Sequence, residues 1–157
     1  MKKNEAKMNN KGFSLVELIV VIAIMAVLVG VLAPMFIRYV EKSRESTDLQ
    51  NLDSIITTIE AYCADKDNIG SGVTVTLKLG DKVTDPASGG STLAINDELV
   101  AAGIIAKSGD PLPKKGNKWD SGKDPCCVYT PATGQKVFTG ESSYYKPNAA
   151  GTALEPK

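Results

Sequence analysis

Few residues of this chain have the types and spacing that catalysis or metal binding requires. Its 157 residues include no histidine, which removes the commonest general base and the commonest metal ligand. Cys63, Cys126 and Cys127 lack the paired spacing of a zinc site. Dinucleotide-binding, P-loop, nucleophile-elbow and HExxH motifs are also absent from the sequence. We therefore assign no catalytic residue, no cofactor-binding residue and no metal ligand, and we expect no enzymatic activity.

Acidic side chains in loops are the remaining candidates for metal chemistry. Oxygen-rich loops can bind calcium, but the spacing here matches no ligand pattern, so we interpret these residues as solvated acids. The 18 basic and 18 acidic residues balance, which gives no signal for a nucleic-acid partner. The loop acids are Asp81, Asp85, Asp97, Asp110, Asp120 and Asp124.

Glu17 is the titratable residue in the most unusual setting. It precedes Leu18–Ile37, a run of 20 residues without a charge, of which 13 are Leu, Ile, Val or Phe. A helix of this length spans roughly 30 Å, the thickness of a bilayer's hydrocarbon core. A carboxylate there costs about 3 kcal/mol, while the large apolar residues return roughly 6 kcal/mol, so the segment still inserts. Glu17 therefore either reaches the membrane interface or awaits a cation from a partner.

A basic leader precedes the apolar run, with lysines at positions 2, 3, 7 and 11. A secretory signal peptide has a similar order, but its cleavage site follows the apolar segment, whereas residues 32–35 lead into further helix-like sequence. An uncleaved signal anchor remains an alternative. Its lysines would keep the leader in the cytoplasm.

Residues 11–24 (KGFSLVELIVVIAI) closely resemble the amino-terminal signature of type IV pilins and the related pseudopilins. The resemblance covers about residues 11–40 and fades beyond them. It implies that a prepilin peptidase cuts after Gly12, removes residues 1–12 and N-methylates Phe13. The family's assembly glutamate falls on Glu17, and its helix-kinking proline falls on Pro34.

The resemblance also implies a partner for Glu17. Cleavage creates an α-amino group on Phe13, and its ordinary pKa of about 7.7–8.0 leaves it mostly cationic at neutral pH. In the family this amine pairs with the glutamate of a neighbouring subunit as the chain polymerises with copies of itself. The implied partners are the prepilin peptidase and methyltransferase, an assembly platform protein with its ATPase, and the membrane before assembly.

The expected fold is α+β, with a long amino-terminal helix whose second half packs on a small antiparallel sheet, as in type IV pilins. We expect a membrane and assembly half over residues 13–37, an amphipathic half over 38–68, and a head over 69–157 that ends in an irregular polar tail. A helix about 80 Å long cannot fit inside a globule about 38 Å across, so its front half should project. Gly30 and Pro34 should kink or open this helix, unless it curves without a break.

The amphipathic half has one apolar stripe with helical spacing. Residues 38–45 are charged and are interpreted as the exit from the membrane. The stripe consists of Leu49, Leu52, Ile56, Ile59 and Cys63, widened by Ile55 and Tyr62, with Asp48, Gln50, Asn51, Asp53 and Glu60 mostly off it.

In the head, alternation predicts a half-buried strand over residues 73–79, and a hairpin joins 126–129 to 135–139. A helix of about two turns should begin at an Asn96 N-cap and stop at Gly103. Residues 85–91 and 107–125 are predicted loops, the second pinned to the head by Trp119.

Cysteine pairing depends on the compartment. A head outside the cytoplasm permits a disulfide between Cys63 and Cys127, with Cys126 as the alternative partner. Adjacent strand residues face opposite sides, so only one of the pair should point at the helix. The other possibility is that all three thiols are free.

The sequence therefore indicates a fibre-forming type IV pilin, anchored once in the membrane with its leader in the cytoplasm and later exposed in a surface pilus. Adhesion and twitching motility would be properties of the fibre. Two alternatives remain, a pseudopilin of a type II secretion or competence system and a single-pass anchored binding domain that does not polymerise.

Overall fold

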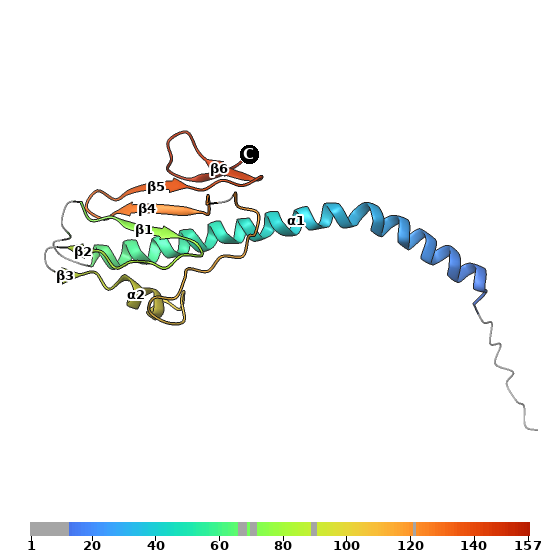
Figure 1. Ribbon diagram of the computed structural model, residues 1–157, viewed down its shortest axis with the longest axis horizontal. Helices are drawn as coiled ribbons and strands as arrows, with labels where there is room; N and C mark the ends of the chain where they lie inside the picture. Colours follow the sequence, from blue (N-terminus) through green and yellow to red (C-terminus); the bar gives the residue numbers. More distant parts are fainter. Residues whose placement is uncertain (1–12, 66–68, 70–71, 89–90, 121) are drawn as a thin grey trace, which may run out of the picture. The chain divides into compact units, whose positions relative to one another are not determined.

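The computed structural model describes residues 13–65, 69, 72–88, 91–120 and 122–157. The chain divides into a first unit, residues 1–39, and a second unit, residues 40–157. Both contribute residues to helix α1, which runs from Leu15 to Ala64 (Figure 1). The predicted long amino-terminal helix is confirmed.

The first unit holds the apolar part of α1. Every side chain over residues 13–39 is exposed, although most of them are large and apolar. The helix is long and apolar enough to cross a membrane, with a mean hydropathy of 3.1 over its most apolar 18-residue window. It continues through Gly30 and Pro34, where the missing proline N–H leaves the Gly30 carbonyl without its helical donor. A kink at these residues stays a prediction.

In the second unit, α1 packs against a three-stranded antiparallel sheet of order β1-β4-β5. The strands are β1 (Val75–Lys78), β4 (Cys126–Thr130) and β5 (Gln135–Thr139). In β1, Val75 and Leu77 are fully buried and Thr76 between them is exposed, as the alternation predicts. The hairpin between β4 and β5 is also confirmed.

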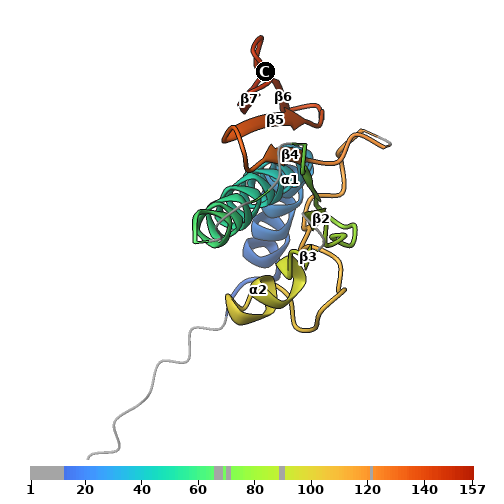
Figure 2. The same ribbon diagram turned by 90° about the vertical axis from the view of Figure 1, so that its left-hand side faces the viewer.

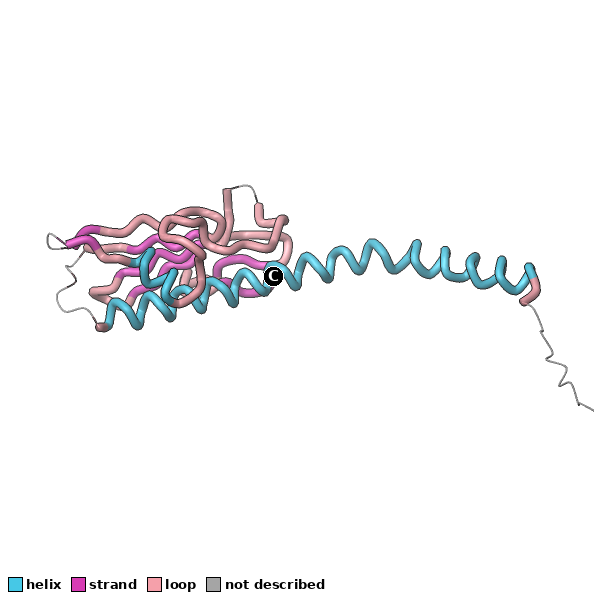
Figure 3. Tube along the Cα trace, turned by 90° about the horizontal axis from the view of Figure 1, so that it is seen from below, coloured by secondary structure: helices cyan, strands magenta, loops and turns pink. Residues whose placement is uncertain are grey.

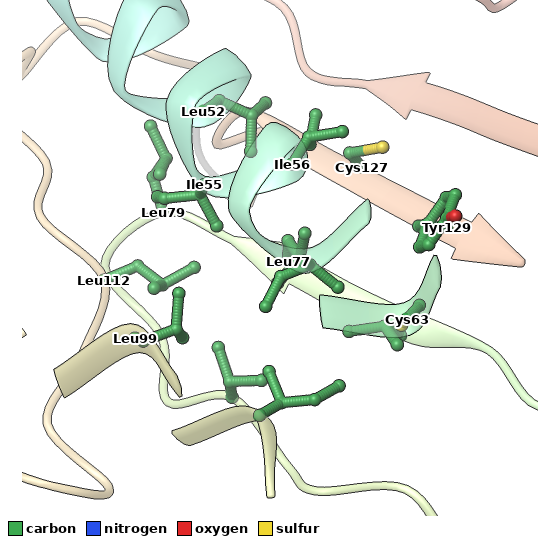
Figure 4. Close-up of a cluster of buried hydrophobic side chains, with 14 of the residues drawn as sticks. Leu52, Ile55, Ile56, Cys63, Leu77, Leu79, Leu99, Leu112, Cys127 and Tyr129 are labelled. Atoms are coloured by element: carbon green, nitrogen blue, oxygen red, sulfur yellow. The ribbon is translucent and has the colours of Figure 1, made fainter. Parts of the chain in front are cut away.

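The core of the second unit lies between α1, the sheet and α2 (Figure 4). Helix α2 (Ile95–Ala101) lies on the side of α1 away from β5 in both Figure 1 and Figure 2. Residues with at most 1% of their surface exposed include Leu52, Ile55, Ile59, Val75, Leu77, Leu79, Ile95, Leu99, Leu112 and Cys127.

Helix α2 ends as predicted but begins differently. Gly103 has φ +72°, and the bonds from Gly103 N–H to Val100 and from Ile104 N–H to Leu99 complete a Schellman motif. Asn96 is not the N-cap, since it lies inside the helix and its buried amide donates to the Val83 carbonyl at 3.0 Å. The side chain is therefore used for a tertiary contact that sequence spacing does not reveal.

The carboxyl-terminal segment is more regular than the predicted irregular tail. β6 (Tyr145–Pro147) and β7 (Leu154–Pro156) form an antiparallel hairpin beside β5. A second small hairpin, β2 (Ala87–Ser88) with β3 (Ser91–Thr92), lies in the predicted loop 85–91. Much of the remaining second unit is loop, drawn pink in Figure 3, including most of residues 107–125.

Candidate functional site

The predicted processing and assembly residues lie at the start of α1. Gly12 is outside the described residues, so the predicted cleavage position is not described. Phe13 precedes the helix and is 88% exposed. The Ser14 backbone N–H donates to Glu17 Oε2 at 2.9 Å, which is the reciprocal half of a capping box. The Ser-x-x-Glu spacing of residues 14–17 is a signal from which this bond could have been predicted.

The capping bond gives Glu17 a donor from its own chain, but a neutral amide supplies no countercharge. A carboxylate has acceptor sites for several donors, so one bond to Ser14 leaves capacity for a cationic group. The capping bond, which the prediction did not include, shows that Glu17 helps to begin the helix. Its pairing with a cation from another subunit stays a prediction.

The three cysteines are free thiols in this structure, so the predicted Cys63–Cys127 disulfide and its Cys126 alternative are not formed. Cys127 lies beside Ile56 in Figure 4, and Cys63 is two helical turns further along α1, about 10 Å away along the axis. A disulfide requires Cα atoms within about 7 Å. The strand residue near Cys63 is instead Tyr129, two positions beyond Cys127.

The two adjacent cysteines do face opposite sides of the sheet, as expected. Cys127 belongs to the core cluster, whereas Cys126 lines a cavity of about 370 Å³ with Lys78 and Lys123. Burial raises the pKa of all three thiols, and that of Cys127 reaches about 12.

A second cluster, which sequence analysis missed, lies on the inward face of α1. Glu41, Glu45 and Asp48 are 5%, 0% and 0% exposed. We call these three residues the acid stripe, because their spacing of four and three continues, towards the amino terminus, the buried face of α1 that includes Leu52. The exit from the membrane at residues 38–45 stays a prediction, but the placement of Asp48 off the apolar stripe is wrong.

The physical reason is a loop rich in N–H donors, residues 114–119, which covers these carboxylates. Asp48 accepts from the backbone N–H groups of Lys115 at 2.6 Å and Gly116 at 2.8 Å. It also accepts from the Trp119 indole Nε1 at 3.0 Å. Hydrogen bonds to an ionised acceptor are roughly twice as strong as neutral ones, so three donors stabilise a buried Asp48.

Glu41 holds the other side of the same loop. Its Oε1 accepts from the backbone N–H groups of Asn117 at 2.5 Å and Lys118 at 3.0 Å. Arg44, half-exposed, lies 3.6 Å from Glu41 Oε2. Loop 114–119 is thus attached to α1 at two carboxylates two helical turns apart.

Glu45 lies between these two acids and has a different partner. The Ser142 hydroxyl donates to Glu45 Oε2 at 2.6 Å. Among the described residues, Glu45 Oε1 is buried with no hydrogen-bond partner. Burial raises the pKa of Glu45, and the nearby Glu41 and Asp48 raise this pKa further.

Trp119 secures the far end of the loop, which confirms the packing interpretation of this residue. It is 7% exposed, and its ring stacks on that of Tyr145 with centroids 6.2 Å apart. Gly116 passes so close to α1 that an added Cβ would lie 2.8 Å from Asp48 Oδ2 and 2.9 Å from Trp119 Nε1. The acid stripe, loop 114–119 and residues 142–145 therefore form one packed unit.

The arrangement of the acid stripe is suited to holding backbone, not to reacting. Asp48 and Glu41 point their oxygens at fixed amides, and the Ser142 hydroxyl beside Glu45 is held by hydrogen bonds. That hydroxyl donates to a buried acid and accepts from the amides of Tyr144 and Tyr145, both at 3.1 Å. The stripe joins α1 to loops distant in sequence.

Several of the loop acids considered for calcium have lysine partners. Lys78 lies 2.9 Å from Asp81, and Lys114 lies 2.8 Å from Asp124. Asp85 accepts from the backbone and side chain of Asn96. Over the described ranges, no group of three or more cysteine, aspartate or glutamate side chains could hold a metal ion.

Comparison with known proteins gives matches at the amino terminus and along the chain. Residues 7–33 match the family profile described as "Prokaryotic N-terminal methylation motif". Prepilin peptidase-dependent protein A of Clostridium perfringens is 43% identical over 74 residues, which are 46% of this chain and 52% of that protein. Type IV major pilin protein PilA of Myxococcus xanthus is 31% identical over 67 residues, 43% of this chain and 30% of that protein.

A longer match covers nearly the whole chain. Type IV wide pilus major component PilA4 of Thermus thermophilus is 26% identical over 152 residues, 95% of this chain and 96% of that protein. The chain thus spans about half or less of the length of the first two relatives and almost all of the third. No solved structure matches the chain.

Proposed function

The chain is a member of the type IV pilin family, hence a structural and non-enzymatic protein, and from this premise we propose that it is a fibre-forming subunit of a type IV pilus. One observation carries the proposal. The apolar part of α1 over residues 13–39 is exposed along its whole length, and it directly follows the predicted cleavage position. Such a surface requires lipid or other subunits around it.

In the proposed pathway the prepilin peptidase removes residues 1–12 and Phe13 is N-methylated. The mature subunit is held in the membrane by residues 13–37 until a platform protein and its ATPase transfer it to the fibre. There the apolar helices of neighbouring subunits replace lipid. Outside the membrane this packing keeps the apolar surface out of water, and at roughly 25 cal/mol per Å² such burial far exceeds the contribution of any single ion pair.

Glu17 would then determine register. An unpaired carboxylate in an apolar fibre core is costly, and pairing with the Phe13 amine of a neighbour removes that cost only in one arrangement. The capping bond from Ser14 supports this role, because it holds the carboxylate at the helix start and leaves acceptor capacity for the amine.

The second unit would supply the fibre surface, and adhesion, aggregation or twitching motility would be properties of that surface. The proposed location is the membrane before assembly, with the leader in the cytoplasm, and the cell exterior afterwards. The pseudopilin of a secretion or competence system is the second candidate, because the amino-terminal motif is shared with that group.

Electron microscopy of sheared surface fibres, with the subunit identified by peptide mass, tests the proposal. We expect fibres whose subunit begins with N-methylated Phe13. A short pseudopilus tied to secretion would favour the pseudopilin, and an uncleaved amino terminus would favour a non-polymerising anchor.

Two variants at one position separate charge from capping. Glu17→Ala removes both, whereas Glu17→Gln keeps an oxygen for the Ser14 amide and removes only the charge. We expect both to lower the yield of fibres at least about tenfold, the equivalent of 1.4 kcal/mol per subunit added. Normal fibres from Glu17→Ala would remove the basis of the pairing.

A further inference from the structure

The three acids of the acid stripe are all buried, but they differ in the number of hydrogen-bond donors that they receive. Asp48 accepts from three N–H groups and Glu41 from two. Glu45, with 0% of its surface exposed, accepts from the Ser142 hydroxyl alone. Donors stabilise the ionised form of a carboxyl group, and burial without donors favours the neutral form.

The hydrogen bonds of Ser142 determine which oxygen of Glu45 acts as an acceptor and which can carry a proton. The Ser142 oxygen accepts from the amides of Tyr144 and Tyr145, which uses both of its lone pairs. Its single proton must therefore point at Glu45 Oε2, which acts as an acceptor. Any proton on Glu45 then lies on Oε1, the oxygen with no partner among the described residues.

The titratable groups near Glu45 come from three elements. On α1 they are Glu41 and Asp48, one turn to either side, and Arg44, which pairs with Glu41. Loop 114–119 contributes the exposed Lys115 and Lys118, and of these Lys118 acts weakly against the two acids. The carboxyl-terminal segment contributes the phenols of Tyr144 and Tyr145 beside Ser142. The repulsion from two carboxylates, each one helical turn away, is larger than the attraction from the solvated lysines. The surroundings of Glu45 therefore disfavour a third negative charge.

We propose that Glu45 is a proton-binding site, and that the acid stripe is a proton-dependent clasp holding loop 114–119 and residues 142–145 against α1. The ligand is a proton and not a metal ion, because the oxygens of Glu41 and Asp48 that face the loop are already occupied by amides. The clasp lies wholly within the second unit and does not depend on polymerisation.

The sign of the pH dependence follows from the folded protein binding this proton more tightly than the unfolded chain does. The contribution of Glu45 is fully present below the ordinary pKa of a glutamate. It is lost as the pH rises through the raised pKa of the folded protein. Deprotonation leaves three buried carboxylates within two turns, so the clasp should loosen as the pH rises.

The direct test is a carbon-13 titration of the full chain in detergent micelles, with glutamate labelled at its side-chain carboxyl carbon. The Glu45 signal is assigned by its loss in Glu45→Gln. We expect it to stay at the protonated position at pH values where the glutamate signals of the urea-unfolded chain have already titrated. Titration of Glu45 at the same pH in the folded and the unfolded protein would overturn the proposal.

The matched stability test uses the isosteric Glu45→Gln variant, which mimics the neutral acid at every pH. Urea unfolding is measured from about pH 4, near the ordinary pKa of a glutamate, up to about pH 8. Relative to Glu45→Gln, the wild-type unfolding constant should rise by up to about tenfold per pH unit. Parallel curves for the two proteins would overturn the proposal.

Two controls exclude other origins of the effect. Asp53→Asn removes a carboxylate from the exposed face of α1 and should leave the pH dependence of the wild type unchanged. Ser142→Ala removes the one donor to Glu45 and should move its titration to still higher pH. Stability that followed sodium concentration at constant pH and constant ionic strength would show a bound cation and overturn the proton assignment.

Discussion

The two parts of helix α1 differ in where they find their packing partners. Over residues 13–39 every side chain is exposed, including Leu28 at 54% and Phe36 at 68%. Over residues 40–64 one face is buried against the same chain, and Leu52 and Ile59 are 1% and 0% exposed. By sequence the first part is apolar on every face, whereas the second has one apolar stripe and several charged residues. The second part therefore finds its packing partners within the chain, and the first exposes apolar surface that only other molecules can cover.

The acid stripe sharpens this contrast. Buried carboxylates are placed where the chain itself supplies donors, as at Asp48 with its three N–H groups. Glu17 in the first part receives one amide from its own chain, and its charge would need another subunit.

The largest effect is expected when a leucine-to-alanine substitution in the second part of α1 is compared with the same substitution in the first part. Leu52→Ala creates a cavity in a packed core and should lower the free energy of unfolding by about 2–5 kcal/mol. Leu28→Ala, at an exposed position, should leave the unfolding of the micelle-bound subunit unchanged and affect assembly only. Urea denaturation of both variants checks this, and equal destabilisation would contradict the division of α1.

The reactivity of the Cys127 thiol measures how well the core beneath the second part of α1 excludes solvent. The pKa of Cys127 is raised from 9.0 to about 12, so its thiolate population at neutral pH should be about a thousandfold lower than that of an ordinary thiol. Alkylation of Cys127 should therefore be slow in the folded protein and reach the rate of an ordinary thiol when the protein is unfolded in urea. Ser54→Cys, on the exposed face of α1, is the fast-reacting control. A cross-linked Cys63–Cys127 peptide in extracellular protein would instead restore the predicted disulfide.

Asp48→Asn tests whether the acid stripe stabilises the fold through the Asp48 carboxylate or only through the packing of a side chain of that size. An amide is nearly isosteric, but its NH₂ group would face donors from Lys115, Gly116 or Trp119. We expect a loss of about 1.5–3 kcal/mol in the free energy of unfolding. The exposed Asp53→Asn is the control and should change it by less than about 0.5 kcal/mol. Unchanged stability in Asp48→Asn would show that the loop is held by packing alone.

Glycine substitutions give the smallest contrast, with opposite signs in the first part of α1 and in the loop that covers its second part. Gly116→Ala places a Cβ against Asp48 and Trp119 and should cost about 1–3 kcal/mol. In Gly30→Ala the added Cβ meets no atom within 4 Å, and the substitution should stabilise the first part of α1 by up to about 1 kcal/mol. Circular dichroism in micelles and urea unfolding measure both, and a neutral Gly116→Ala would show that loop 114–119 can shift away.

Features set by neighbours in sequence were predictable. The alternation of residues 73–79, the turn before β5 and the Gly103 stop each depend on a few adjacent residues. Asn96 shows where this fails. Its spacing suits an N-cap, yet its amide is bonded to Val83 and Asp85, which are 13 and 11 residues away. The carboxyl-terminal hairpin was missed because its composition is polar, while its order depends on Tyr145 stacking on Trp119.

By itself the sequence determined the membrane-length helix, the processing motif around Phe13 and Glu17, and the strands of the small sheet. Helical and strand periodicities are local, and so they can be read along the chain. Only the tertiary structure decided that Glu41, Glu45 and Asp48 are buried. Their donors lie between 67 and 97 residues away, and a carboxylate on a helix is solvated or buried according to whether such donors reach it.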